Sequence, residues 1–170
     1  MEESPKFELK KLNLDGIKAA FEKAVRYRLL NQPRLAASIC YDILEVDPNH
    51  ENAIIELILA LSDQFERGSA QTIADVNSLL TRLIGDYNKT YYNGIVRERR
   101  GTSALTSRGI GTDYVAFGFY MSAMEFYEEA EKLSPPDNND AILRWNTCAR
   151  IIMEFRLRPD PADNSEPVLE

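Results

Sequence analysis

The chain has 170 residues, of which 44% are hydrophobic and 28% are charged, and its formal net charge is −7 at pH 7. The length fits one domain of roughly 100 to 200 residues, and the composition is that of a chain that folds around a core. The negative charge disfavours long-range attraction to nucleic acid or to an anionic membrane, and no apolar run approaches the about 18 residues of a membrane span. We therefore expect a cytoplasmic protein that does not span a membrane.

The first helices follow an N-terminal arm over residues 1–13, in which Glu and Lys alternate early. Apolar residues then recur with the 3.6-residue period of an amphipathic helix over 17–24 and again over 36–43. Asn31, Gln32 and Pro33 separate the two patterns, and a proline suits the first turn of a helix better than its interior. The sequence predicts a helical hairpin here.

The same period returns over 54–65 and 73–84, on either side of a breaker stretch at 66–71, and predicts a second hairpin. A further helix is expected over 87–100, then a long loop at about 101–112, a helix that ends before Pro135, and a last helix over 142–152. Residues 157–170 are rich in proline and acidic residues, so we expect a disordered tail. The expected fold class is all-α, with about seven helices and no sheet, in one domain over 14–156.

No residue pattern indicates catalysis or a cofactor. Cys40 and Cys148 stand far apart within apolar helical patterns, without the spacing of a metal site, and are expected to be reduced core thiols. The only histidine, His50, lies in a turn-forming sequence between helices and receives no role. Trp145 falls on the apolar stripe of the last helix and is expected in the core. We predict no metal, no cofactor, no catalytic residue and no enzymatic activity.

An internal repeat joins the two most regular segments. Ala36 lies twelve positions before Pro48, and Ala123 lies twelve before Pro135, with aromatic or apolar stripes between them. This pattern resembles the second helix of the tetratricopeptide repeat. The matching residues are Gly118, Tyr120, Ala123, Tyr127, Ala130, Leu133 and Pro135 in one unit, and Tyr27, Ala36, Val46 and Pro48 in a more degenerate one, where Asn31 replaces the family's glycine.

The spacing of the repeats departs from the family. Pro48 and Pro135 lie further apart than two repeats of about 34 residues. We place the surplus in the loop before Ala74 and between Arg100 and Gly118. The resemblance covers roughly 17–155 and is weakest in the second repeat, over 54–84, and in the last helix.

The resemblance implies a short right-handed superhelix of antiparallel hairpins, whose concave face is lined by the first helix of each pair and binds a protein or peptide segment. Transferred to this sequence, it gives a groove that is apolar at one end and basic at the other, suited to a partner with an apolar segment followed by carboxylates. The candidate partner-binding residues are Phe21, Val25, Arg28, Ile55, Leu59, Asn93, Arg97 and Arg100. The family's carboxylate clamp needs Lys and Asn where this chain has Phe21 and Val25, which argues against that specific function.

Other interpretations stay open at this point. The same side chains can pack between helices, with the arginines solvated. The arginine-rich stretch 97–108 can serve a regulatory or RNA-associated module, although it lacks the GK[ST] sequence and the preceding strand of a P-loop and has few aromatic neighbours for stacking bases. A third interpretation is a structural homo-oligomer, such as a homodimer, that forms through an uncapped end of the repeat.

Overall fold

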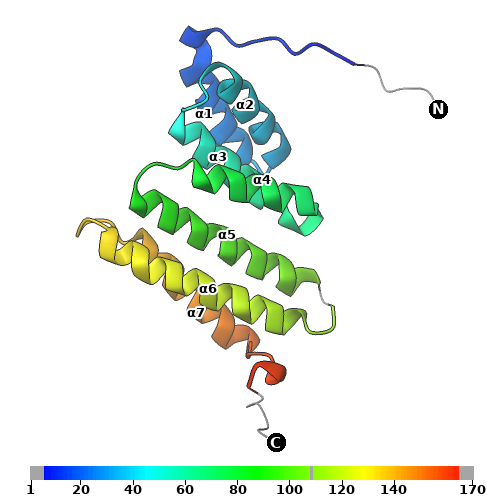
Figure 1. The fold of residues 1–170 in the computed structure, drawn as a ribbon, viewed down its shortest axis with the longest axis vertical. Coiled ribbons are helices and arrows are strands. Elements are labelled where there is room, and N and C mark those ends of the chain that lie inside the picture. The colour runs from blue at the N-terminus through cyan, green and yellow to red at the C-terminus, as the bar shows by residue number, and fades with distance from the viewer. Residues whose placement is uncertain (1–5, 108, 165–170) are drawn as a thin grey trace, which may run out of the picture. The chain divides into compact units, whose positions relative to one another are not determined.

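The computed structural model describes residues 6–107 and 109–164. Within these residues the chain is all-helical, without strands, which confirms the predicted fold class (Figure 1). Three short 3-10 helices accompany the α-helices: η1 (Leu14–Gly16), η2 (Phe65–Arg67) and η3 (Pro161–Asn164). The seven α-helices of the described residues are α1 (Ile17–Leu29), α2 (Pro33–Val46), α3 (Glu51–Ser62), α4 (Ala70–Thr81), α5 (Asp86–Ser107), α6 (Thr112–Leu133) and α7 (Asp140–Phe155).

Contacts between residues divide the chain into two compact units, one up to Ala60 and one from Leu61, so the boundary falls inside α3. In each unit, helices that follow one another in sequence pack on one another, as in a helical repeat.

The hairpin of the first unit is closed by Asn31. Its φ of 58° lies in the left-handed region, where asparagine is the best substitute for glycine. The backbone N–H groups of Asn31 and Gln32 donate to the carbonyl oxygens of Arg28 and Tyr27, each at 2.9 Å, and thereby satisfy the last turn of α1. Pro33 then starts α2 within its first two positions, as predicted. Helices α1 and α2 pack together around a core of small and branched residues: Ala24, Ala36, Ala37, Cys40 and Ile43.

His50 begins α3. Its Nδ1 accepts a hydrogen bond of 3.1 Å from the backbone N–H of Ala53, three residues further along the chain. This is the hydrogen bond that an N-cap side chain supplies, and it requires the imidazole Nδ1 to be unprotonated. The turn role expected for this region is therefore performed by the histidine itself.

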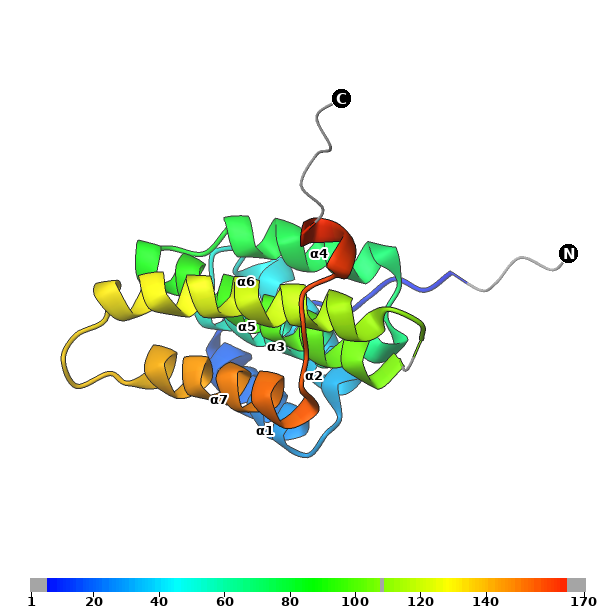
Figure 2. The ribbon, with the colours of Figure 1, turned by 90° about the horizontal axis from the view of Figure 1, so that it is seen from below.

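The second unit is organised by the pair α5 and α6, which run antiparallel, with α7 against α6 (Figures 1 and 2). Two glycines of α5 allow two tyrosines of α6 to lie directly against its backbone. A Cβ at Gly94 would lie 2.6 Å from Cε1 of Tyr127, and one at Gly101 would lie 3.1 Å from Cε2 of Tyr120. Both tyrosines are almost completely buried, so this close approach forms the core of the unit.

The predicted loop over 101–112 is wrong for most of its length, because α5 continues to Ser107 and α6 already begins at Thr112. The residues of this stretch are poor helix formers by themselves. Packing overrides that preference: Gly101 lies against Tyr120, and the hydroxyl oxygens of Thr102 and Tyr120 are 2.9 Å apart. What was expected as an inserted loop instead lengthens both helices of the hairpin.

The predicted disordered tail is also wrong at its start. Arg156 ends α7 with a left-handed φ of 52°, and the backbone N–H of Leu157 donates to the carbonyl oxygen of Ile152 at 3.0 Å. Leu157 is buried, as the apolar residue of such a helix ending usually is. The 3-10 helix η3 follows, and the part of the predicted tail at 165–170 lies outside the described residues.

Candidate functional site

The predicted groove residues fall in both units. The apolar candidates and Arg28 belong to the first unit, whereas Asn93, Arg97 and Arg100 belong to the second. All eight candidates are partly exposed, which distinguishes them from the buried core and from fully solvated positions. The predicted groove therefore consists of an apolar part in the first unit and a basic part in the second.

In the first unit, Phe21 and Arg28 contact residues that the predicted groove does not include. The ring of Phe21 lies 5.6 Å from that of His50, centroid to centroid. The Nε of Arg28 is 2.6 Å from Oε1 of Glu56, whose side chain is buried. A carboxylate removed from water requires such a counter-charge, so Arg28 has a structural role that the sequence analysis did not assign to it.

The first unit also contains a hollow that none of the predicted residues lines. Its volume is about 360 Å³, and it lies between α1, α2 and the segment that precedes α1. Small residues open this space, and Lys23 and Asp42 supply the charged side chains. The lining residues are Leu12, Gly16, Ala19, Ala20, Lys23, Ile39 and Asp42.

In the second unit, Arg97 and Arg100 lie three residues apart on α5, and therefore on neighbouring positions of one helix face. The guanidinium carbon of Arg100 lies 4.3 Å from the ring centroid of Phe119 on α6, which is a cation–π contact. Burial lowers the pKa of Arg100, and the charge of Arg97 lowers it further. We call Arg97, Arg100 and Phe119 the basic face of the hairpin.

Neither arginine of the basic face has a carboxylate partner within the part of the chain that the structure describes. Their neighbour in sequence, Arg99, differs: its guanidinium contacts Ser62 Oγ at 2.5 Å and Asp63 Oδ1 at 2.9 Å. The arginines of this stretch thus lie on different faces of one helix. Of the arginines at positions 97, 99 and 100, only the two of the basic face have no carboxylate partner among the described residues.

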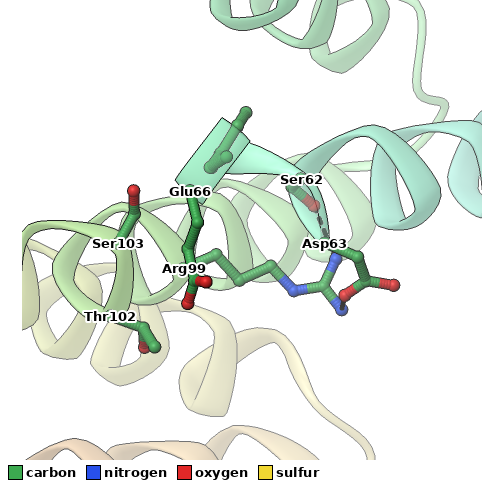
Figure 3. A pocket seen from close by; sticks show the side chains of 7 residues that line it. Ser62, Asp63, Glu66, Arg99, Thr102 and Ser103 are labelled. Carbon is green, nitrogen blue, oxygen red and sulfur yellow. Dashed lines mark hydrogen bonds and ion pairs between the residues drawn. The ribbon is translucent and has the colours of Figure 1, made fainter. Parts of the chain in front are cut away.

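Arg99 lies in a small polar cleft of about 140 Å³ (Figure 3). Glu66, on the same cleft, accepts a hydrogen bond of 3.1 Å from the hydroxyl of Thr106. The positive charge of Arg99 is neutralised within the cleft, because its guanidinium is bound to Asp63. The cleft therefore offers no unpaired cation to an acidic ligand.

Sequence analysis missed a buried polar cluster at the centre of the second unit. Tyr127 donates a hydrogen bond of 2.6 Å to Glu98 Oε2, and Arg144 of α7 donates one of 3.2 Å to Oε1 of the same carboxylate. Burial raises the pKa of Tyr127, as do the charge of Glu98 and this hydrogen bond. The cluster joins three helices, and its donors and acceptors are matched, so it holds the fold together.

No group of three His, Cys, Asp or Glu side chains that could hold a metal ion occurs among the described residues. None of the described helices is long and apolar enough to cross a membrane. Cys40 and Cys148 are buried free thiols, as predicted.

The fold and the basic face define an all-α protein built of antiparallel helix hairpins, with a partly desolvated arginine pair on one of them. No protein-family model matches the chain. No curated protein and no solved structure is significantly similar to it.

Proposed function

We propose that this chain is a protein-interaction module without catalytic activity, and that it binds an acidic segment of a partner protein through the basic face. The observation that carries the proposal is the pair Arg97 and Arg100, which has no carboxylate partner in the described part of the chain although burial disfavours the charged form of Arg100. A partner carboxylate would supply the missing counter-charge.

The contact with Phe119 supports this assignment. The ring holds one side of the guanidinium of Arg100 in place, so less side-chain entropy is lost when a ligand binds the edge of the guanidinium. Asn93, one turn before Arg97 on α5, is partly exposed and donates its amide to the carbonyl oxygen of Lys89 at 2.8 Å. That bond orients the side chain, and its amide oxygen accepts no hydrogen bond from the described residues.

We infer further that the hairpins are degenerate tetratricopeptide units in a cytoplasmic protein. The small residues Ala123 and Ala130, both fully buried, and the close packing of Tyr127 on Gly94 support the repeat assignment. The two buried free thiols support a reducing compartment. Phe21, Val25, Ile55 and Leu59 would then contact an apolar segment of the same partner.

The RNA-associated alternative loses support from the helical form of residues 97–107. A loop could gather all its arginines on one phosphate chain, whereas α5 directs Arg99 to Asp63 and leaves two arginines on the basic face. Phosphate binding also predicts a steep loss of affinity as salt concentration rises.

The test is affinity capture from a native cell extract, with and without nuclease, followed by mass spectrometry of proteins and detection of nucleic acid. The wild type is compared with Arg97→Glu/Arg100→Glu and with the control Lys10→Glu/Arg34→Glu, which changes the net charge equally at exposed positions. A protein partner held by the wild type and the control, but lost by the first variant, supports the proposal.

A second variant sharpens the result. Arg97→Lys/Arg100→Lys keeps the charge but removes the planar guanidinium groups, so it should weaken the binding of a carboxylate by about tenfold. Equal capture of the same partner by all four proteins would show that the basic face is not the site. Nuclease-sensitive capture would support the RNA-associated alternative instead.

A further inference from the structure

The outer side of α7 carries large apolar residues in the open. One side of the helix packs on α6 and buries Ala141 and Cys148. Away from that side, Leu143 is 61% exposed and Met153 is 68% exposed, and Ile142 is 36% exposed. Scattered apolar residues on a surface are ordinary, but here three large ones lie on the outer side of one helix.

Two of these residues, Ile142 and Met153, belong to a row of α7 that has the spacing of a helix-pairing seam. Ile142, Asn146, Ala149 and Met153 follow one another at intervals of four, three and four residues, and all are at least partly exposed. The order is similar in both directions, because large apolar residues lie at the ends and small or polar ones at the centre. A second α7 lying antiparallel would place Ile142 of each copy beside Met153 of the other, and Asn146 beside Ala149.

The charges at the two ends of α7 suit the same arrangement. Asp137 and Asp140 lie at its start, and Arg156 and Arg158 lie at its end, all of them exposed. None of the four takes part in an ion pair within the residues that the structure describes. Antiparallel pairing in the register of the seam would bring the acids of each copy to the arginines of the other, and the two helix dipoles would also be opposed.

We propose that a second copy of this chain docks antiparallel along the outer side of α7 and forms a symmetric dimer. The contact is isologous, because each copy offers the same seam and the same pair of charged ends. This surface lies on α7, apart from the arginines of α5, so the proposal does not depend on the basic face.

The test uses two variants that repel themselves and attract each other. Arg156→Glu/Arg158→Glu makes both ends of α7 acidic, and Asp137→Lys/Asp140→Lys makes both ends basic. Sedimentation velocity of the wild type should show a mass that rises from the monomer value of 19.4 kDa toward twice that value as concentration increases. Each variant alone should dimerise at least tenfold more weakly, and an equimolar mixture of the two should recover the dimer.

The seam is tested by Ala149→Glu, which introduces two carboxylates at the centre of the contact. The matched control is Leu29→Glu, at an exposed apolar position of α1, and it should leave the dimer unchanged. Circular dichroism and melting temperature establish that each variant is folded before its mass is interpreted.

Two outcomes would overturn the proposal. One is a wild type that stays monomeric up to about 1 mM, where even a contact of about 4 kcal/mol becomes visible. The other is a wild-type dimer that withstands Ala149→Glu and both charge variants, because that dimer must use another surface.

Discussion

Gly94 of α5 lies directly beneath the ring of Tyr127 of α6, so closely that a Cβ at position 94 would stand 2.6 Å from Cε1 and 2.8 Å from Cδ1. The ring cannot easily move away, because the Tyr127 hydroxyl donates to Glu98 at 2.6 Å and the side chain is fully buried. The glycine thus sets the distance between the two longest helices.

We predict that Gly94→Ala destabilises the protein by about 1–2 kcal/mol. Alanine stabilises a helix relative to glycine by about 1 kcal/mol. Overpacking a rigid core costs about 1–3 kcal/mol, and a contact as short as 2.6 Å should cost an amount near the upper limit of that range. Urea unfolding followed by circular dichroism measures the difference.

Gly118→Ala is the matched control. Gly118 also lies inside a long helix, but it is exposed and a Cβ there would meet no atom within 4 Å. Only the helix preference acts, so we expect stabilisation by about 0.5–1 kcal/mol. If both alanines stabilise the protein, the close packing of α5 on Tyr127 is not rigid.

A second prediction concerns the buried carboxylate of Glu98, which is 8% exposed and binds both Tyr127 and Arg144. Tyr127→Phe should cost about 1.5–3 kcal/mol, the usual effect of losing a hydrogen bond to a charged group. Glu98→Gln should also destabilise the protein, because Arg144 loses its counter-charge, but water screens part of that loss since the Arg144 side chain is 43% exposed.

The double variant Tyr127→Phe/Glu98→Gln tests whether the two side chains act as a pair. Its loss of stability should be smaller than the sum of the single losses by about 1 kcal/mol or more. Strict additivity would mean that the hydroxyl and the carboxylate do not interact in solution.

The sequence identified the helices because their apolar residues keep a 3.6-residue period, which survives wherever one side of a helix is buried. It misplaced the end of α5 for a physical reason. Residues 101–107 have weak helix preference and few apolar side chains, and what holds them helical is tertiary: the contact of Gly101 with Tyr120 and the hydrogen bond from Thr106 to Glu66. Tyr120 lies on α6 and Glu66 on η2, so neither partner can be assigned before the packing of α5 on both elements is known.

In the candidate site, too, the features set by one helix were predictable and the contacts between helices were not. That Arg97 and Arg100 share a helix face follows from their spacing, and this was predictable. The ring of Phe119 beneath Arg100 and the carboxylate of Glu56 beside Arg28 come from other helices. Their placement depends on helix register, which a single sequence does not specify.

A third prediction separates a structural role of Arg28 from a role in binding. Glu56 is 4% exposed and lies 2.6 Å from the guanidinium, so Arg28→Ala should leave a buried charge unpaired and cost about 3 kcal/mol or more. Arg28→Met/Glu56→Leu, which removes both charges, should recover most of that loss, as measured by urea unfolding. If Arg28→Ala unfolds at the same urea concentration as the wild type, the ion pair with Glu56 does not stabilise the fold, and a role of Arg28 in binding a partner becomes the better explanation.

The last prediction follows from the two buried thiols. Burial raises the pKa of Cys40 from 9.0 to about 12, with a smaller contribution from Glu56, and it raises the pKa of Cys148 to about 12, with a smaller contribution from Glu98. Between pH 9 and 12 the unfolded chain therefore releases protons that the folded chain keeps. The free energy of unfolding must fall as pH rises through this window, by up to about 1.4 kcal/mol per pH unit for each thiol.

Urea unfolding at pH 8, 9 and 10 measures this slope in the wild type and in Cys40→Ala/Cys148→Ala. Tyrosines, whose ordinary pKa is about 10, also begin to ionise in this range, but both proteins carry the same tyrosines and their contribution cancels when the slopes are compared. The alanine variant starts from a lower stability because it loses core atoms, so the slopes are compared rather than the absolute values. We expect the wild type to lose about 2.7 kcal/mol more than the variant between pH 8 and 10. Parallel slopes would mean that the thiols also ionise in the folded protein, and hence that water reaches them.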